Sequence, residues 1–290
     1  MRLIKSHGSR NEIFVAEGRP DSLPAPGEFV RRVCDREAWT SGGDGVYFYD
    51  ADQAWFFNPD GSAAEFCGNG MRCLGRHLLD LRGTDSETIV SGSFSYTVRR
   101  TASVSGVEQV AVSLPPLSFE TAVPDAFAGF TPVEVPNPHV VALVEKYSEP
   151  DLVTYGELAP DAFPEGANVS FLLPLAPAEV FVRTYERGAG LTPSCGSGAV
   201  ASRAVYSRVA GVDPALPVQI RNVGGVARSW IDVRDGVWHP VLEGNATVIF
   251  RASAGPSGEM LAAPEYAADE AAAYSALESE NLSRLAAILA

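Results

Sequence analysis

Short runs of alternating apolar and polar residues mark much of the first half of the chain. They occupy residues 2–5, 12–16, 46–49 and 54–58, and a series of runs from 87 to 115. Each run is bounded by Gly, Pro, Asn or Asp, which favour turns and are poor strand residues. A period of two between turn residues is typical of half-buried β-strands, so the pattern predicts a chain built mainly from short strands.

Helical periodicity is confined to a few places, and the two clearest examples begin directly after a cysteine. Apolar residues recur at helical spacing at Met71, Leu74, Leu78 and Leu81 after Cys67, and at Val200, Ala204, Val205 and Val209 after Cys195. A glycine, Gly83 or Gly211, follows each run in the position typical of a helix C-terminus. The pattern therefore predicts two helices, each with a cysteine at its N-terminus.

The sequence around these two helix starts repeats itself. Phe66-Cys67-Gly68-Asn69-Gly70 in the first half matches Ser194-Cys195-Gly196-Ser197-Gly198 in the second. Strand-like runs precede each motif and hairpin-like runs follow it, so we expect two similar α/β halves. The proline-rich stretch 114–117 is the best boundary, which gives an N-terminal half at 1–115 and a C-terminal half at 116–245.

The last segment, residues 246–290, follows a different pattern. After residues 252–257 comes a tail rich in alanine and glutamate, in which Leu282, Leu285 and Leu289 fall on one face of a helix. We expect a closing strand and then a terminal helix that docks on the protein or pairs with another copy.

Composition and charge exclude several classes of protein. The 290 residues include 36 acids and 22 bases, a net charge of −14, whereas proteins that bind nucleic acid carry a basic surface. No apolar stretch approaches the roughly 18 residues of a membrane-spanning helix, and the N-terminus lacks the apolar core of a secretory signal. We therefore expect a cytoplasmic protein with no nucleic-acid or membrane partner, whose four cysteines are thiols.

A cysteine at the first turn of a helix is chemically useful. Unpaired backbone N–H groups and the positive end of the helix dipole stabilise a thiolate, so we expect a lowered pKa that makes Cys67 and Cys195 bases at neutral pH. The glycines at the next and third positions would let a carboxylate approach the bare amides of the same turn. A single Cys-Gly-x-Gly is more often a small buried residue before a glycine turn, but two copies in related halves favour catalysis.

Two such cysteines on opposite sides of one carbon would meet the needs of racemisation. One thiolate removes the α-proton of an amino acid while the opposite thiol delivers a proton to the other face. Two helix N-termini directed at the substrate carboxylate would stabilise the developing carbanion electrostatically. The sequence contains no phosphate-binding loop, zinc-ligand spacing or dinucleotide fingerprint, so we expect no cofactor and no metal. A disulfide between Cys67 and Cys195 is the rival role, and Cys34 and Cys73 are expected in the core.

Taken together and in order, the motifs closely resemble those of the diaminopimelate epimerase family over roughly residues 1–250. The matching segments are His7-Gly8 with Asn11, Asn58-Pro-Asp60-Gly61-Ser62, Cys67-Gly-Asn-Gly-Met-Arg-Cys73, Asn137-Pro-His139, Phe163-Pro-Glu165 with Asn168-Val169, and Glu186-Arg-Gly-Ala-Gly190 followed by Cys195-Gly-Ser-Gly198. So many ordered motifs make the resemblance highly specific.

The resemblance implies a fold and a reaction. The fold is two pseudo-symmetric α/β (α+β) domains, each a curled mixed β-sheet wrapped around a central helix, with the active site in the interdomain cleft. The reaction is the cofactor-independent epimerisation of LL-diaminopimelate to meso-diaminopimelate, for lysine and cell-wall synthesis. The resemblance also implies a homodimer that binds a small amino-acid substrate.

The resemblance further assigns roles to matching positions. Cys67 and Cys195 take those of the acid/base thiols, and His139 and Glu186 assist proton transfer. The residues implied to hold the α-carboxylate and ammonium are Asn11, Gly68, Asn69, Gly196 and Ser197. Those implied to bind the distal amino-acid group are Asn58, Asn137, Asn168, Glu186 and Arg187. Glu186 and Arg187 offer one carboxylate and one guanidinium, which suits a second zwitterion, although this pair alone is more typical of a surface turn.

Four positions depart from the family pattern. Ser9 and Arg10 replace Leu-Gly in the usual His-Gly-Leu-Gly-Asn, Pro136 replaces the glycine before Asn-Pro-His, and Leu191 replaces a glutamate. The tail beyond Ala252 is also longer than is usual. These departures leave open a racemase of another amino acid, such as histidine, on the same scaffold. A non-catalytic amino-acid-binding protein is the third alternative, which retention of both cysteines and both glycine turns disfavours.

Overall fold

The computed structural model describes residues 1–119 and 122–290 and forms two compact units. Unit 1 comprises Met1–Val112 and Gly244–Leu277, and unit 2 comprises Ser113–Glu243 and Glu278–Ala290. The proline-rich stretch 114–117 therefore lies at the start of unit 2. The closing segment, 246–290, is divided between the two units.

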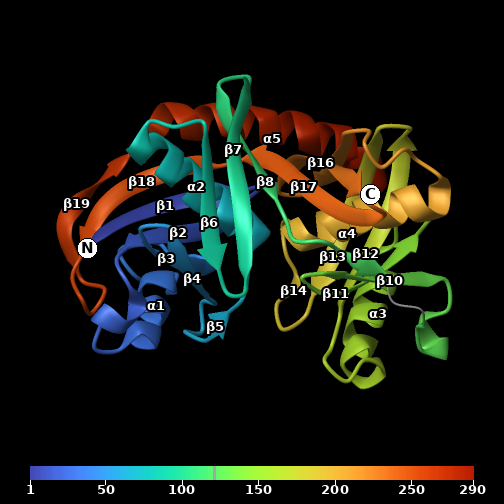
Figure 1. Cartoon of the computed structure of the whole chain (residues 1–290), viewed down its shortest axis with the longest axis horizontal. Coiled ribbons are helices and arrows are strands. Elements are labelled where there is room, and N and C mark those ends of the chain that lie inside the picture. The colour runs from blue at the N-terminus through green and yellow to red at the C-terminus, as the bar shows by residue number, and fades with distance from the viewer. Residues whose placement is uncertain (120–121) are drawn as a thin grey trace. The chain divides into compact units, whose positions relative to one another are not determined.

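Unit 1 is built on a mixed β-sheet (Figure 1). Its strands are β1 Arg2–Gly8, β2 Asn11–Glu17, β3 Gly45–Asp50, β4 Gln53–Phe57, β5 Ala63–Ala64, β6 Ser86–Ser91, β7 Phe94–Val104, β8 Val107–Ser113, β18 Thr247–Ala254 and β19 Met260–Tyr266. In the order β1-β2-β3-β4-β6-β7 the neighbours are antiparallel, parallel, antiparallel, parallel and antiparallel. β18 pairs with β1 and β19 with β18, while β5 pairs with β4.

Unit 2 repeats this arrangement with its own strands. They are β9 Ser118–Phe119, β10 Phe130–Val135, β11 Asn137–Leu143, β12 Asn168–Ala176, β13 Glu179–Glu186, β14 Gly190–Leu191, β15 Val218–Asn222, β16 Gly225–Arg234 and β17 Val237–Asn245. In the order β10-β11-β12-β13-β15-β16 the pairings are again antiparallel, parallel, antiparallel, parallel and antiparallel. The short strand β14 pairs with β13 as β5 does with β4.

Helices fall at the same places in both repeats. They are α1 Pro26–Cys34 before β3, α3 Glu149–Ala162 before β12, α2 Gly68–Arg82 after β5 and α4 Gly196–Ala210 after β14, with short 3-10 turns at Pro20–Ser22 and Asp125–Phe127. The repeat confirms the predicted α/β fold of two similar halves. The apolar pattern of the sequence predicted neither α1 nor α3. α1 is only nine residues long, and α3 buries only Leu152, Gly156 and Ala159, so neither carries a long apolar period.

The two predicted helices form the centres of their units. α2 packs against β1, β2, β3, β6 and β7, and α4 packs against β10, β11, β12, β13 and β16. Each has 15 residues and ends at a glycine in the left-handed region, with φ 67° at Gly83 and 72° at Gly211, as helix C-caps often do. Because strands surround each helix, its N-terminus and the cysteine there are firmly placed.

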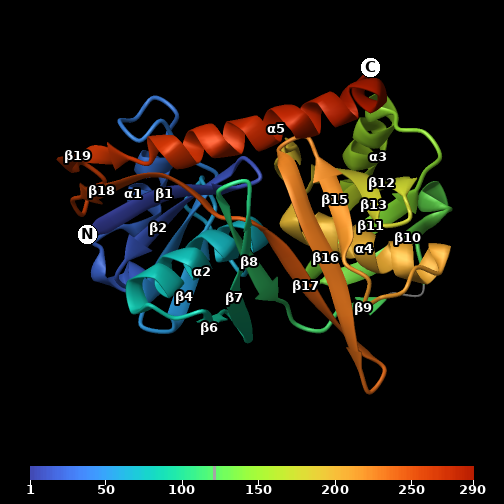
Figure 2. The same cartoon turned by 90° about the horizontal axis from the view of Figure 1, so that it is seen from above.

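The chain closes with α5 (Ala268–Leu289), a continuous helix with residues in both units (Figure 2). The predicted terminal helix is confirmed, but its predicted apolar face is partly wrong, because Leu282 and Leu289 are exposed. The buried residues are Tyr274, Asn281 and Leu285, which share one face at helical spacing. The apolar pattern did not reveal this face because Asn281 is polar. Its buried amide donates to the Asn222 carbonyl at 2.8 Å. None of the helices in the described ranges is long and apolar enough to cross a membrane.

Candidate active site

Cys67 occupies the N-cap of α2, where hydrogen bonds fix it. Its sulfur accepts from the backbone N–H of Gly70 at 3.3 Å. Its own N–H donates to the Tyr47 hydroxyl at 3.0 Å, and that hydroxyl donates to the Cys67 carbonyl at 3.4 Å. These hydrogen bonds hold the backbone of Cys67, and the residue is partly exposed.

Asn11, the first residue of β2, is a further partner of the Cys67 thiol. The thiol donates to Asn11 Oδ1 at 3.4 Å. The Asn11 amide nitrogen donates to the Asp44 carboxylate at 3.2 Å, and the same carboxylate oxygen accepts from the N–H of Glu12 at 2.7 Å. Asp44 therefore sets the orientation of the Asn11 amide, with its oxygen toward the sulfur.

The turn before Asn11 has a demanding backbone. Ser9 and Arg10 join β1 to β2 with φ values of 52° and 64°, both in the left-handed region. A two-residue hairpin turn of this kind favours Asn-Gly, and other residues pay about 1 kcal/mol each for the left-handed conformation. Two of the four departures from the family pattern thus fall on one strained turn beside the thiol's partner.

Cys195 occupies the equivalent N-cap, that of α4. Its sulfur accepts from the N–H of Gly198 at 3.3 Å, the same distance as in the Cys67 motif, and lies 3.5 Å from the Ser197 hydroxyl. The two cysteines also share extended backbone angles, with φ −133° and ψ 113° at Cys67 and φ −115° and ψ 116° at Cys195. They differ in exposure, since Cys195 is buried.

The surroundings of Cys195 correct one prediction. We expected the helix N-terminus to lower the thiol pKa, but burial and the nearby charge of Glu186 raise the pKa of Cys195 well above its ordinary value. Glu186, the last residue of β13, accepts a hydrogen bond from the Thr192 hydroxyl, which holds its carboxylate in place. A buried thiolate beside a carboxylate loses more in solvation and repulsion than the helix end returns. At neutral pH Cys195 is therefore a thiol.

His139 and Asn168 lie in register on the neighbouring strands β11 and β12. His139 is buried, with Nε2 3.2 Å from the Asn137 side-chain oxygen, and burial together with the charge of Arg187 lowers its pKa to about 3. The imidazole is thus neutral. Asn168 accepts from the N–H of Arg187 at 3.0 Å and donates to the Pro138 carbonyl at 3.0 Å. Four predicted residues, Asn137, His139, Asn168 and Arg187, therefore come together in unit 2.

The other predicted residues occupy two kinds of position. Gly68, Asn69, Gly196 and Ser197 are buried in the first turns of α2 and α4. Asn58 lies in the turn after β4, where its amide donates to the Ser62 hydroxyl at 3.1 Å within the same turn. Arg187, whose backbone N–H contacts Asn168 as described above, has an exposed side chain that donates to the Glu165 carbonyl.

The third glycine of each cysteine motif serves packing. A side-chain carbon at Gly70 would lie 2.8 Å from the Tyr47 ring, and one at Gly198 would lie 2.5 Å from the Thr184 hydroxyl. Both distances are far shorter than van der Waals contact. These glycines let each helix start approach the strand behind it, and the approach of a ligand carboxylate to the amides of the same turn stays a prediction.

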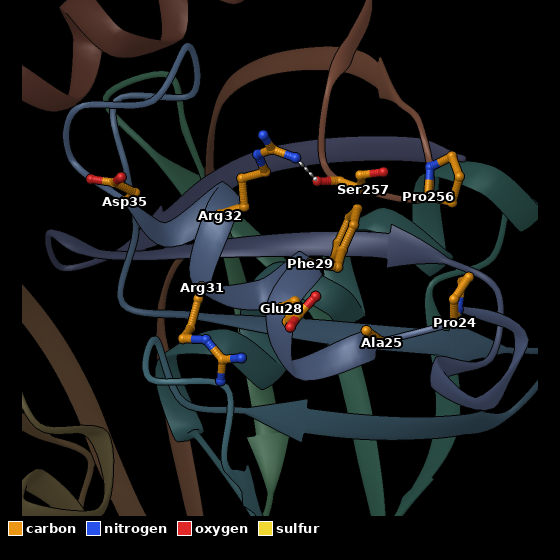
Figure 3. Close-up of a pocket in the computed structure, with 9 residues that line it drawn as sticks. All are labelled: Pro24, Ala25, Glu28, Phe29, Arg31, Arg32, Asp35, Pro256 and Ser257. Atoms are coloured by element: carbon orange, nitrogen blue, oxygen red, sulfur yellow. Dashed lines mark hydrogen bonds between the residues drawn. The ribbon is translucent and has the colours of Figure 1, made fainter.

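A hollow of about 540 Å³ lies between α1 and residues 256–257 of unit 1 (Figure 3). Arg32 reaches across it and donates to the Ser257 carbonyl at 3.1 Å. The hollow is lined by Pro24, Ala25, Glu28, Phe29, Arg31, Arg32, Asp35, Pro256 and Ser257, none of which is a predicted site residue. Within residues 1–119 and 122–290, no group of three or more His, Cys, Asp or Glu side chains is arranged to hold a metal ion.

Each cysteine and the residues that contact it form a half-site, the Cys67 half-site in unit 1 and the Cys195 half-site in unit 2. Three residues of these half-sites were not identified from the sequence. Tyr47 fixes Cys67, Asp44 orients Asn11, and Thr192 holds Glu186. Tyr47 lies in an apolar strand, so the sequence pattern does not distinguish it from a core residue. Asp44, next to the start of β3, and Thr192, within the last family motif, carried weak signals by position alone.

Comparison with known proteins identifies relatives of the chain. The family described as diaminopimelate epimerase matches residues 131–249. A diaminopimelate epimerase from Methanopyrus kandleri is 34% identical over 263 residues, which cover 87% of this chain and 88% of the relative. Another from Enterococcus faecalis is 31% identical over 282 residues, which cover 84% of this chain and 86% of the relative.

Solved structures share the fold at much lower identity. A phenazine biosynthesis protein of the PhzF family from Bacillus anthracis aligns with a TM-score of 0.66 at 14% identity, covering 87% of this chain and 97% of that protein. A predicted epimerase from Pseudomonas aeruginosa aligns with a TM-score of 0.65 at 16% identity, covering 90% and 99%. These similarities concern the fold alone and agree with its two α/β repeats.

Proposed function

The chain belongs to the diaminopimelate epimerase family, and from this premise we propose that it interconverts LL- and meso-diaminopimelate without a cofactor. The observation that carries the proposal is the repeated half-site. Each unit places a cysteine at the N-cap of its central helix, with Asn11 beside Cys67 and Glu186 beside Cys195. Two thiols in equivalent frames match the chemistry of inversion at a carbon that carries a weakly acidic proton.

The proposed reaction moves one proton on each face of the α-carbon. After the Cys67 thiol has given up its proton to solvent, the thiolate takes the α-proton, and the electron pair of the broken C–H bond stays on the carbon. The Cys195 thiol then gives its proton to the opposite face, which leaves Cys67 as thiol and Cys195 as thiolate, and the return reaction reverses both steps. The raised pKa of Cys195 supports its assignment as the proton donor in the resting protein.

Backbone N–H groups in the first turns of α2 and α4 are proposed to stabilise the carbanion through the substrate carboxylate. These turns contain Gly68 and Asn69 in unit 1 and Gly196 and Ser197 in unit 2. A helix N-terminus presents unpaired donors and a positive dipole end, which favour an anion. Stabilisation of this kind acts where negative charge develops.

For the distal amino-acid group we propose Arg187 as the contact for the carboxylate, because its guanidinium is exposed while Asn168 fixes its backbone. We place Glu186 beside Cys195 instead of at the distal ammonium, since its carboxylate raises the Cys195 pKa. We assign Asn58 and Asn137 as acceptors of hydrogen bonds from that ammonium. The buried Nδ1 of His139 has no hydrogen-bond partner among the described residues, and we propose that it serves the reacting end of the substrate.

Proton NMR of the reduced protein in deuterium oxide tests the proposal. Offered LL-diaminopimelate, the protein should replace the α-proton by deuterium and form the meso isomer. A panel of L-amino acids that includes histidine is tested in parallel. Exchange with another amino acid alone would keep the two-thiol chemistry and reassign the substrate, whereas no exchange with any would overturn the proposal in favour of amino-acid binding.

A further inference from the structure

Tyr274 of α5 contacts the turn that leads into Asn11. Its buried ring meets the His7 ring edge-on, with centroids 4.4 Å apart. The Arg10 guanidinium lies 5.1 Å from the centroid of the same Tyr274 ring, within the range of cation–π attraction, and donates to the Ser275 hydroxyl at 3.5 Å. One helical side chain thus contacts a residue of β1 just before the β1–β2 turn and a residue of the turn itself.

This turn needs outside support because its backbone is strained. Ser9 and Arg10 both hold left-handed φ values, which glycine adopts freely and residues with a side chain do not. The N–H of Arg10 donates to Nδ1 of His7 at 3.3 Å. His7 can accept because burial, and then the charges of nearby cations, lower its pKa to about 3 and keep the ring neutral.

The same face of α5 also holds the helix that carries Cys67. Glu270, one turn before Tyr274, accepts from the guanidinium of Arg76 in α2 and from the N–H of Val248 at 3.1 Å. Residues four apart lie on one side of a helix. The first turns of α5 therefore contact both α2 and the β1–β2 turn, and all of these residues belong to unit 1.

We propose that α5 is a positioning element for the Cys67 half-site, in which Tyr274 acts on Asn11 through Arg10 while Glu270 acts on α2 through Arg76. Asn11 follows the turn directly and accepts from the Cys67 thiol at 3.4 Å, so movement of the turn moves the thiol's partner. This inference rests on the proposed function of Cys67 as an acid/base. Proton transfer is sensitive to sub-ångström alignment, so loss of the support lowers turnover more than substrate binding.

The test compares Tyr274→Leu and Tyr274→Phe with Tyr266→Leu in the full-length protein. Tyr266 is an exposed aromatic residue of unit 1 that contacts Phe250, so it makes a matched control. One readout is kcat and KM with LL-diaminopimelate. The other is the rate at which iodoacetamide alkylates Cys67, followed by peptide mass spectrometry, with the buried Cys34, Cys73 and Cys195 as internal references.

Tyr274→Leu is expected to lower kcat about tenfold with KM nearly unchanged, and to speed Cys67 alkylation because the thiol loses a fixed acceptor. Tyr274→Phe keeps the ring and should restore most of kcat, and Tyr266→Leu should match the parent protein.

Arg10→Ala provides a second variant, which removes the guanidinium from the Tyr274 ring but keeps a side-chain carbon at the strained position and leaves the buried ring in place. It should reproduce part of the effect of Tyr274→Leu, and the double variant should lose less than the sum of the two, since both changes remove the contact between Arg10 and Tyr274. Folded Tyr274→Leu and Arg10→Ala proteins with parental Cys67 alkylation would overturn the inference. A parent protein that exchanges no α-proton would overturn the proposed function instead, and the alkylation rates would still decide whether α5 positions Cys67.

Discussion

The two half-sites share a backbone and differ in the side chains around the sulfur. β4 and β13 hold the same place in the repeat, yet the last residue is Phe57 in β4 and Glu186 in β13. The hairpins differ as well. Asn11 opens β2 and accepts from the Cys67 thiol, whereas the equivalent Asn137 opens β11 and lies 3.2 Å from the His139 ring.

The comparison teaches that a helix N-terminus alone does not decide whether a cysteine is a base. Both sulfurs accept from a backbone N–H three residues on, at 3.3 Å. Burial and a carboxylate nevertheless raise the pKa of Cys195. An enzyme that needs one base and one acid gains from this inequality, because the proton has a preferred resting place.

The largest expected effect is the loss of either thiol. Cys67→Ala and Cys195→Ala should each lower epimerisation by about 10³-fold, because the remaining thiol cannot both remove and deliver the proton. The measurement is formation of the meso isomer from LL-diaminopimelate. Cys73→Ala, a buried cysteine in α2 outside the half-site, is the control and should stay active. Full activity in either site variant would break the two-base comparison.

Removal of the acidic neighbour should make the two thiols more alike. In Glu186→Gln the pKa of Cys195 should fall, because the negative charge of the Glu186 carboxylate no longer opposes the thiolate. Alkylation of Cys195 at pH 8 should then rise about tenfold. Phe57→Leu at the equivalent position of unit 1 is the control and should leave Cys67 alkylation unchanged. An unchanged Cys195 rate in Glu186→Gln would show that burial alone raises its pKa.

The Tyr47 hydroxyl should contribute to stability through its hydrogen bonds with the Cys67 backbone. Tyr47→Phe leaves the N–H of Cys67 without its acceptor, so the free energy of unfolding in urea should fall by about 1–3 kcal/mol. Tyr96→Phe is a matched control, because the Tyr96 hydroxyl is buried with no hydrogen-bond partner among the described residues. Its unfolding energy should stay within about 0.5 kcal/mol of the parent. Equal losses in both variants would show that the hydrogen bond from the Cys67 N–H to the Tyr47 hydroxyl adds no stability.

The two units should differ least in their contribution to acid stability, because each contains a buried histidine. His7 in unit 1 and His139 in unit 2 each have a pKa lowered from 6.5 to about 3, so between these values the unfolded chain binds protons that the folded chain does not. Their contribution is complete above pH 6.5 and is lost as the pH falls toward 3.

Urea midpoints at pH 7 and pH 5 measure this contribution. His139→Gln should flatten the pH dependence relative to the parent protein. The same slope in both proteins would contradict the neutral, buried state of His139.

The parts of the fold that the sequence predicted are those governed by local rules. The period of two located β1, β2, β3 and β4, and the helical period after each cysteine located α2 and α4 with their glycine ends. The roles assigned to Cys67 and Cys195 remain predictions, although their places at helix N-caps are as expected. α1 and α3 were not predicted because a helix that buries only a few residues produces only a weak apolar period in the sequence.

The sequence by itself determined where the two cysteines stand, because N-cap geometry, glycine stops and hydrophobic period act within a few residues of one another. Only the tertiary structure decided what surrounds each sulfur. Burial and a carboxylate from β13 govern the pKa of Cys195, and a tyrosine from the last helix supports the turn beside the partner of Cys67. Desolvation and charge depend on groups brought together from distant parts of the chain, and no local pattern records them.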